Sequence, residues 1–358
     1  MKYRVLSSKI VEWYEEHRRP LPWRRTRDPY RIWLSEIILQ QTRVLQGLPY
    51  YKKFIQRYPT VQSLAVATER DVLRLWQGLG YYSRARNLRK CAITVLKDYN
   101  GKFPDNFTEL KLLPGIGDYT AAAIASFSFG EPVAVLDGNV FRVLSRLFGI
   151  HDEISSSVGK KKFTTLANQL VPVDNPGQHN QAMMEFGALH CTPANPLCAD
   201  CFLKTACIAY ANNWQSTLPV KKKPKKASLR HFYYFVVQRK GRFLMSKRPT
   251  GDIWTGLYEF PLLETEGPLS QKQLEKSLTK ENQVYFNKIN SMKVSSAYKH
   301  VLTHQLIHAR FVELGLEMKN EQLDKGLFAG SKFYSPRQAA ALPKSVLINR
   351  YLHETGAL

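Results

Sequence analysis

The chain has 358 residues, which is longer than a single hydrophobic core usually grows and sufficient for two domains. With 44% hydrophobic and 23% charged residues it is typical of a folded protein, and no stretch approaches the ~18 consecutive apolar residues of a membrane helix. The net charge of +23 favours a polyanionic partner, of which nucleic-acid backbones are the usual example.

Positive charge is concentrated in two segments. Residues 1–100 carry 20 Lys and Arg against 8 Asp and Glu, and residues 201–250 carry 12 against none. Residues 101–200 carry 7 against 10, a net charge of −3. A basic protein without a polyanionic partner is the alternative, because charge alone does not identify a partner. The N-terminus has no apolar run long enough for a secretory signal, so we expect a cytoplasmic protein with no membrane association.

Residues 1–213 are predicted to form a mainly helical domain. Asp28-Pro29 is a typical helix start, because Asp can cap a helix and Pro suits its first position. The helix expected next carries Glu36 among apolar residues. Separated by Gly and Pro, further helices are predicted over 61–76, 84–99, 118–128, 138–148, 160–170 and 179–190.

Two glycines form a tight turn before one of these helices. They are Gly115 and Gly117 in the sequence Leu-Pro-Gly-Ile-Gly of residues 113–117. Backbone N–H groups at such a turn can bind a phosphate, because glycine lets a nucleic-acid backbone approach closely. A simple connection between two helices is the alternative interpretation.

Four cysteines lie within 17 residues near the end of the helical domain, in the spacing C-x6-C-x2-C-x5-C. Disulfides are disfavoured in a chain without a secretion signal. Four thiolates this close suit a tetrahedral metal ion or a [4Fe–4S] cluster. Structural zinc stays open, although its sites usually show two closely spaced pairs and only one is present here. The residues are Cys191, Cys198, Cys201 and Cys207.

A basic linker is predicted at 214–229, because five of the six residues 221–226 are lysine. Beyond it, residues 230–358 are predicted to form a smaller α+β domain. Strand-like segments, rich in aromatic and β-branched residues, are at 231–238, 242–248 and 293–317, and a helix is expected over 342–352.

Several of these motifs together resemble one enzyme family. LPGIG, Asp137 twenty residues after Gly117, and the cysteine spacing are similar to the helix-hairpin-helix DNA glycosylases of the endonuclease III superfamily. LPWRRTRDPYRIWLSEIILQQTRV at 21–44, WQGLGYYSRARNLRK at 76–90 and NQAMMEFGALHC at 180–191 resemble the adenine glycosylases of the MutY family. Residues from about 230 resemble the Nudix-like domain of that family.

The resemblance implies a function, a cofactor and a partner. The function is excision of adenine mispaired with 8-oxoguanine or guanine in base excision repair, and the partner is double-stranded DNA that contains such a mispair. The cofactor is a [4Fe–4S] cluster on the four cysteines. We expect a monomer associated with a bacterial nucleoid.

The resemblance also implies which residues carry the chemistry. Asp137 is the catalytic carboxylate, which stays ionised and stabilises positive charge on the sugar. Glu36 is the acid that protonates adenine, because burial among apolar residues raises a carboxyl pKa. A salt bridge between Glu36 and a nearby arginine is the alternative. Asn139 orients Asp137, or caps the following helix. Tyr119 occupies the position at which bifunctional relatives carry a Schiff-base lysine, so we expect no efficient strand cleavage.

The residues that contact DNA are predicted in the same way. Gln41 and Tyr81 match the family's wedge residues, which fill the stack when a base is extruded. Gln181 lies where the family binds the edge of adenine. The lesion-recognition sequence of the family is Phe-Ser-His, and the corresponding residues here are Leu302, Thr303 and His304. Basic residues expected on the DNA-facing surface are Arg24, Arg84 and Arg86.

Two other functions stay open. A thymine or uracil glycosylase acting on G mispairs can share LPGIG and the cysteine spacing, but Glu36, Gln181 and the long C-terminal domain argue against it. A non-catalytic lesion-binding protein could keep the fold, but the presence of both carboxylates argues against that function.

Overall fold

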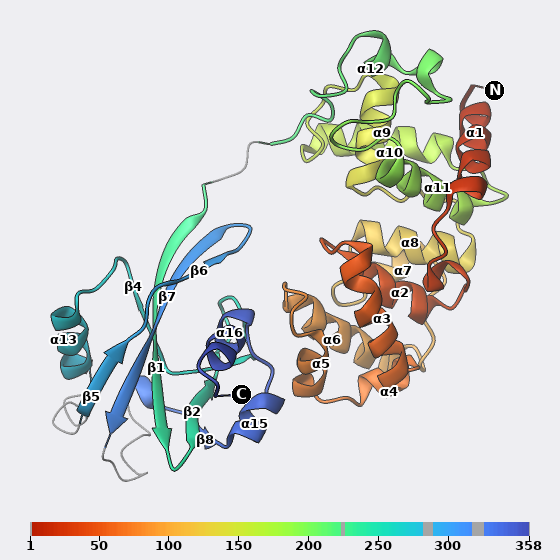
Figure 1. Cartoon of the computed structure of the whole chain (residues 1–358). Coiled ribbons are helices and arrows are strands. Elements are labelled where there is room, and N and C mark those ends of the chain that lie inside the picture. Colours follow the sequence, from red (N-terminus) through yellow and green to blue (C-terminus); the bar gives the residue numbers. More distant parts are fainter. Residues whose placement is uncertain (1, 223–225, 282–288, 317–325, 358) are drawn as a thin grey trace. The chain divides into compact units, whose positions relative to one another are not determined.

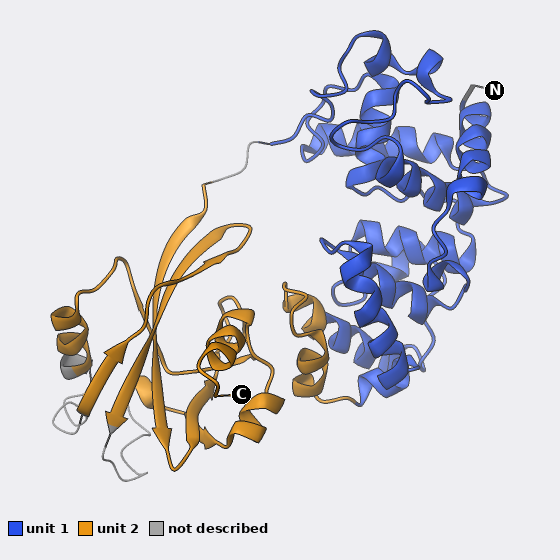
Figure 2. Ribbon diagram, in the orientation of Figure 1, with its two compact units in different colours: residues 1–66, 87–223 blue, residues 67–86, 224–358 orange. Residues whose placement is uncertain are grey.

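The structure is a computed structural model of the chain that describes residues 2–222, 226–281, 289–316 and 326–357. Residues 223–225 of the predicted linker therefore lie outside the described residues. The chain forms two compact units, residues 1–66 with 87–223 (unit 1) and residues 67–86 with 224–358 (unit 2) (Figure 2). The assignment of 67–86 to unit 2 was not expected from the sequence. Among the described residues, no helix combines the length and apolar character needed to span a bilayer.

Unit 1 is helical, as predicted (Figure 1). Helix α6 (Ser83–Asp98) begins in the segment assigned to unit 2 and continues into unit 1. The other helices of unit 1 are α1 (Lys2–His17), η1 (Pro22–Arg24), α2 (Pro29–Leu39), α3 (Val44–Arg57), α4 (Val61–Ala65), α7 (Phe107–Leu110), α8 (Asp118–Phe129), α9 (Gly138–Phe148), α10 (Ser157–Leu170), α11 (Pro176–Leu189), η2 (Lys204–Ala206) and α12 (Ile208–Ala211).

Local capping explains where these helices begin. The predicted start at Asp28-Pro29 is confirmed, because the Asp28 side chain accepts a hydrogen bond of 2.9 Å from the Tyr30 amide at the start of α2. The single helix predicted over 61–76 is wrong. Helix α4 ends at Ala65 and α5 (Glu69–Trp76) starts anew, because the Thr68 side chain caps it by accepting from the Asp71 amide.

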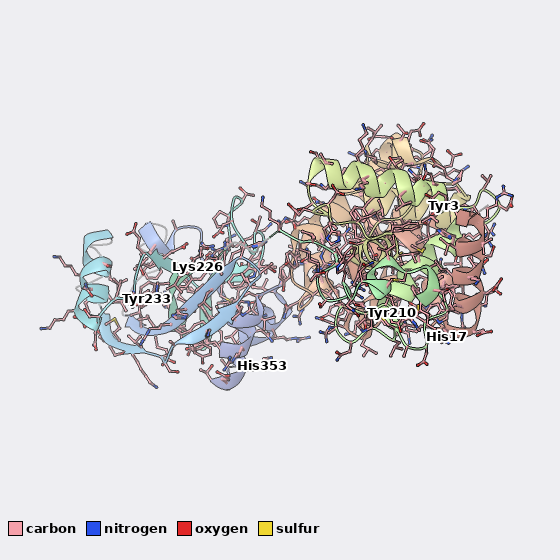
Figure 3. The ribbon with its side chains drawn as sticks, turned by 90° about the horizontal axis from the view of Figure 1, so that it is seen from above. Tyr3, His17, Tyr210, Lys226, Tyr233 and His353 are labelled. Carbon is pink, nitrogen blue, oxygen red and sulfur yellow. The ribbon has the colours of Figure 1, made fainter. Side chains whose placement is uncertain are left out.

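The core of unit 1 positions helix α1, whose two ends are marked by Tyr3 and His17 in Figure 3. Leu6, Ile10 and Tyr14 recur every four residues and form one buried stripe. This stripe packs in a hydrophobic cluster with residues of α9, α10 and α11. Because α1 contacts α11, residues near the N-terminus lie beside residues near position 181.

Unit 2 contains the predicted α+β domain, built on a mixed sheet (Figure 1). The described strands follow the order β3-β2-β1-β7-β5, β1 and β7 run parallel, and β4, β6 and β8 pair with β1, β7 and β2. The strands are β1 (Ser228–Arg239), β2 (Arg242–Lys247), β3 (Tyr258–Glu259), β4 (Leu262–Thr265), β5 (Ile289–Val294), β6 (Tyr298–Val301), β7 (Gln305–Leu316) and β8 (Lys332–Tyr334). The helices beyond the linker are α13 (Gln271–Glu281), η4 (Gly326–Phe328), α15 (Pro336–Ala341) and α16 (Val346–Glu354), and β1 begins within the predicted linker.

Strand β1 is buried on both faces, which explains its continuous apolar sequence. Tyr233, labelled in Figure 3, shares one face with Phe235 and packs in a cluster with residues of α13. On the other face Tyr234 stacks on Phe311 of β7 at 5.4 Å between ring centroids, and Phe311 stacks on Tyr351 of α16 at 3.8 Å. This aromatic stack joins the sheet to the C-terminal helix.

Phe311→Ala should destabilise unit 2 by about 3–5 kcal/mol, because it removes the middle ring of a fully buried stack. Chemical denaturation of the full chain, followed by near-ultraviolet circular dichroism, measures the loss. Leu229→Ala is the control, because Leu229 of β1 is 51% exposed and its truncation should change stability by less than about 0.5 kcal/mol. Equal effects of the two substitutions would contradict the packing described above.

Candidate active site

A pocket with a cavity volume of about 580 Å³ lies in unit 1 among α2, α8, α9 and α11. It collects residues that are more than 150 positions apart in the sequence. Of the predicted site residues it is lined by Arg24, Glu36, Tyr119, Asp137, Asn139 and Gln181.

Asp137 is the N-cap of helix α9. Its Oδ1 accepts from the backbone amides of Asn139 and Val140 at 2.8 and 2.7 Å, and its Oδ2 accepts from Asn139 Nδ2 at 2.7 Å. The residue that caps α9 is therefore Asp137 and not Asn139, and Asn139 orients the Asp137 carboxylate. Three N–H donors and the helix N-terminus favour the ionised carboxylate.

Glu36 is almost completely buried in α2, with 5% of its surface exposed. The Tyr119 hydroxyl donates a hydrogen bond to Glu36 Oε2. Burial raises the pKa of Glu36 to about 7, the charge of Asp137 adds to this rise, and the Tyr119 hydrogen bond and Arg24 oppose it. Glu36 forms no salt bridge among the described residues. The structure therefore does not show the alternative in which Glu36 pairs with a nearby arginine.

The two carboxyls differ in the environment that each offers a negative charge. Burial raises the pKa of Asp137 too, but hydrogen bonds from Val140 and Asn139 oppose that rise. Glu36 receives one hydroxyl donor, whereas Asp137 receives three N–H donors. The pKa of each carboxyl is raised, but the three N–H donors make Asp137 the better site for a negative charge and Glu36 the better site for a proton.

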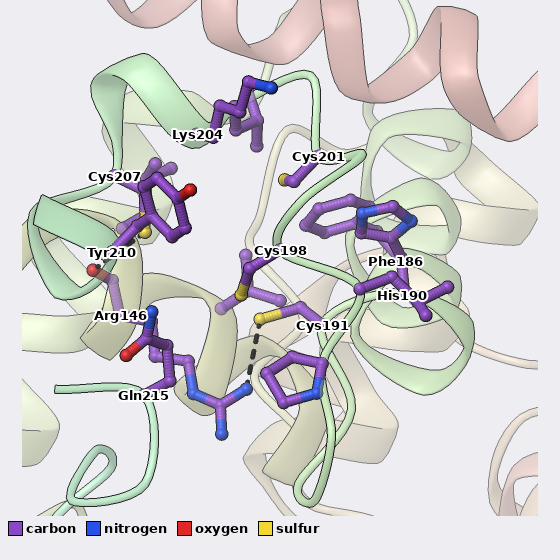
Figure 4. A pocket seen from close by; sticks show the side chains of 15 residues that line it. Arg146, Phe186, His190, Cys191, Cys198, Cys201, Lys204, Cys207, Tyr210 and Gln215 are labelled. Atoms are coloured by element: carbon purple, nitrogen blue, oxygen red, sulfur yellow. Dashed lines mark hydrogen bonds between the residues drawn. The ribbon is translucent and has the colours of Figure 1, made fainter. Parts of the chain in front are cut away.

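Helix α9 also links the pocket to the cysteine segment. Arg142 Nη2 donates to Asn139 Oδ1 at 2.9 Å, and Arg142 Nε donates to the carbonyl of Cys191 at 2.8 Å. One turn later, Arg146 Nη1 donates to Cys191 Sγ at 3.4 Å (Figure 4). Arg142 and Arg146 were not singled out from the sequence. Their separation of four residues, on the helix that follows Asp137, was the available signal.

The four predicted cysteines line one small pocket (Figure 4). They are reduced, and Phe186, His190 and Arg146 stand around them. The described residues contain no group of three or more His, Cys, Asp or Glu placed to hold a single metal ion.

A buried ion pair forms one wall of the active-site pocket. Glu185 of α11 accepts from Arg24 through both oxygens at 2.8 Å, and Arg19 Nε donates to Glu185 Oε1 at 2.8 Å. Burial raises the pKa of Glu185, but these arginines outweigh it and bring the pKa to about 2. The Arg24 side chain is 13% exposed, so it lies in the pocket wall and not on an open surface. Glu185 was missed, yet it follows Gln181 by one helical turn.

The glycine turn connects α7 to α8. Gly115 has φ of 78°, and a Cβ there would stand 2.6 Å from Asn87 Cβ, so glycine is required by conformation and by space. Gly117 is exposed and caps α8, and no atom lies within 4 Å of the position of its missing Cβ. The backbone at Gly117 is therefore open to a ligand.

A second pocket, of about 500 Å³, lies in unit 2. It is lined by residues 79–83 and by the turn between β6 and β7, where Thr303 and His304 are exposed. The Tyr81 hydroxyl and Thr303 Oγ1 share a hydrogen bond. The predicted wedge residue thus meets the predicted lesion-recognition residue in one unit. The predicted surface arginines Arg84 and Arg86 instead donate to the carbonyls of Gly80 and Thr255.

Glu36→Gln should make the chain more stable at pH 8 and leave it little changed at pH 5. The folded pKa of about 7 exceeds the ordinary 4.5, so the fold favours the neutral carboxyl. That stabilisation is complete below pH 4.5 and is lost as the pH rises through 7, by an amount of the order of 3 kcal/mol. Urea denaturation at the two pH values tests this. Glu16→Gln, at an exposed position of α1, is the control, and an identical gain at both pH values would contradict the expectation.

Known families match both parts of the chain. Residues 34–169 match the family model of the HhH-GPD superfamily base excision DNA repair proteins, and residues 233–354 match the NUDIX domain. A solved thermostable thymine-DNA glycosylase is 32% identical with a TM-score of 0.55 and covers 59% of this chain and 97% of its own. A trapped endonuclease III–DNA intermediate, 23% identical with a TM-score of 0.52, shares the fold.

Curated relatives extend over both units. The adenine DNA glycosylase of Buchnera aphidicola subsp. Schizaphis graminum is 38% identical over 305 residues, which cover 85% of this chain and 86% of the relative. The adenine DNA glycosylase of Mus musculus is 33% identical over 87% of this chain and 71% of the relative. The chain therefore belongs to the adenine DNA glycosylase family.

Proposed function

We propose that this protein is a monofunctional DNA glycosylase that excises adenine paired with 8-oxoguanine or guanine in double-stranded DNA. The observation that carries the proposal is the pair of unlike carboxyls in one pocket. Glu36 has a pKa raised to about 7, and Asp137 is held by three N–H donors. Family membership supports adenine as the base.

The reaction needs both carboxyls in different protonation states. Glu36 transfers its proton to a ring nitrogen of adenine, and the C1′–N9 bond breaks with its electron pair leaving on the base. The sugar then carries an oxocarbenium charge, which the Asp137 carboxylate stabilises directly or by a transient bond. A water molecule adds to C1′ and gives up a proton to the Glu36 carboxylate, which leaves an abasic site and restores the acid.

The pocket suits a base-excising step without strand cleavage. A lyase step requires an amine that attacks the sugar, and none of the described residues that line the pocket is a lysine. Tyr119, at the position of the lysine in bifunctional relatives, instead donates a hydrogen bond from its hydroxyl to Glu36 Oε2. Tyr119 therefore contributes a hydrogen bond to the proposed acid, Glu36, and has no nucleophilic amine.

Two exposed side chains are suited to fill the DNA stack. Gln41 has φ of 54° and Tyr81 has φ of 47°, so each sits in the left-handed region that non-glycine residues rarely adopt. Tyr81 is 44% exposed although it is aromatic. Strained, exposed residues cluster at functional sites, which supports the wedge roles proposed for both.

The pocket in unit 2 supports recognition of the opposite base. Thr303 supplies a hydroxyl where the family sequence has serine, and its bond to Tyr81 places that hydroxyl beside the proposed wedge. Thr303 and His304 are therefore proposed to contact 8-oxoguanine. Thymine excision is the second candidate, favoured by the similarity to a thymine-DNA glycosylase. That protein, however, covers 59% of this chain, whereas the match to the adenine DNA glycosylase of Buchnera aphidicola subsp. Schizaphis graminum covers 85%.

The donor set fits a [4Fe–4S] cluster. Four thiols line the same pocket, and only one pair of them is closely spaced in the sequence, whereas structural zinc sites usually show two such pairs. Arg146 would supply a hydrogen bond to one thiolate sulfur. The cluster would hold the 191–207 loop closed, with Cys191, Cys198, Cys201 and Cys207 as its ligands.

Duplexes that contain A·8-oxoG, A·G, T·G or U·G test the function. Adenine should leave the first two, and the rate should fall about tenfold per pH unit above about 7 as Glu36 ionises. Asp137→Asn should slow excision at least a hundredfold while DNA affinity is largely kept. Asp98→Asn, an exposed position of unit 1, should have no effect. Release of thymine or uracil alone, or tight binding without release of any base, would contradict the proposal.

Metal analysis tests the cofactor. The purified chain should hold about four iron atoms, and Cys198→Ala should lower that content. Cys91→Ala is the matched control, because Cys91 is a buried thiol outside this pocket. One zinc per chain in place of iron would reject the cluster.

A further inference from the structure

A tyrosine outside the predicted site contacts the residue expected to bind adenine. The Tyr14 hydroxyl donates a hydrogen bond of 2.8 Å to Gln181 Oε1. Tyr14 is 2% exposed and belongs to the core of unit 1, whereas Gln181 lines the active-site pocket. The contact joins α1 to α11 across 167 positions of the sequence.

The surroundings keep Tyr14 a donor. The guanidinium of Arg24 lies 5.5 Å from the centre of the Tyr14 ring, and the bonds to Glu185 hold Arg24 in place. Burial raises the pKa of Tyr14, so its hydroxyl keeps the proton that it donates. A cation near the ring also makes the phenol a stronger donor.

The hydrogen bond determines which way the Gln181 amide faces. Oε1 has two lone pairs, and Tyr14 uses one of them. A rotation of the amide by 180° would place Nε2 against the Tyr14 hydroxyl, which could accept a hydrogen bond from Nε2 but would leave its own buried O–H without this acceptor. One remaining lone pair of Oε1 and the two N–H groups of Nε2 are left for the pocket.

We propose that Tyr14 is a positioning residue that makes the site select 6-aminopurines over 6-oxopurines, by locking the Gln181 amide in one orientation. On the edge formed by N1 and the C6 substituent, adenine presents an amino donor beside a ring-nitrogen acceptor, which matches the fixed Oε1 and Nε2 of a bidentate amide. A 6-oxopurine such as hypoxanthine reverses this pattern on the same edge, so its C6 oxygen meets Oε1 and its N1–H meets Nε2. A free amide could rotate and accept either base.

This inference rests on the proposed function, and it is tested by a ratio of rates. Duplexes carry adenine or hypoxanthine opposite 8-oxoguanine, and single-turnover excision is measured for each. Tyr14→Phe should reduce the adenine-to-hypoxanthine rate ratio about tenfold, the size of one hydrogen bond. Tyr30→Phe is the matched control, because it removes another buried tyrosine hydroxyl, bonded to the Tyr58 carbonyl, and should leave the ratio unchanged.

A second substitution separates positioning from general damage. In a Gln181→Ala background, Tyr14→Phe should no longer change the ratio, because no amide is left to orient. An equal slowing of both bases by Tyr14→Phe, or a further change of the ratio without Gln181, would overturn the proposal.

Two further measurements cover a failure of folding or of catalysis. If Tyr14→Phe does not fold, Gln181→Ala removes the amide that Tyr14 orients, so the adenine-to-hypoxanthine rate ratio should fall about tenfold; an unchanged ratio would overturn the proposal. If the unmutated chain releases no adenine, the proposed function fails by itself. The base preference is then measured as the affinity for duplexes with 2′-fluorinated nucleosides, which resist cleavage. Equal affinities for the two bases would contradict the proposed orientation of the Gln181 amide.

Discussion

The site depends on one capping interaction, the carboxylate of Asp137 on the first turn of helix α9. A capping carboxylate is held by backbone amides, so its position is set by the helix and not by a flexible side chain. The same helix carries Asn139, Arg142 and Arg146 toward the segment of Cys191. One rigid element therefore connects the pocket to the cysteines, and the loop of residues 191–207 bears on the geometry of the carboxylate.

Burial has opposite consequences for the acidic residues of the pocket. Glu185 is ionised because Arg19 and Arg24 pair with it, while Glu36 forms no salt bridge among the described residues and lies near Asp137, so its proton is favoured. An unpaired charge in a buried site is costly, and the raised pKa of Glu36 reduces that cost because the neutral carboxyl prevails below a pH of about 7. Arg24 also lowers the pKa of Glu36, but burial outweighs its effect.

Local sequence signals predicted the helical domain, the α+β domain and the start of α2, whereas the family resemblance predicted six of the residues that line the pocket. Each of these depends on a few neighbouring residues, such as Asp28-Pro29 or the cysteine spacing. Contacts across long separations were not predictable in the same way. The bond from Tyr14 to Gln181 spans 167 positions, and the assignment of residues 67–86 to unit 2 depends on packing that no motif encodes. The break between α4 and α5 was missed because one capping threonine outweighed the helical pattern.

The backbone near Tyr81 supports a role for the side chain itself. Gly78 and Gly80 adopt φ of 102° and 74°, so this loop uses glycine where only the backbone conformation matters. Tyr81 adopts φ of 47° as well, at a cost of the order of 1–2 kcal/mol that a glycine would remove. Its ring is half exposed, so packing does not compensate for that cost. The hydroxyl bond to Thr303 gains too little from an exposed pair to explain the strain by itself. Stacking of the Tyr81 ring on the bases of bound DNA, as proposed above, would account for the strained conformation.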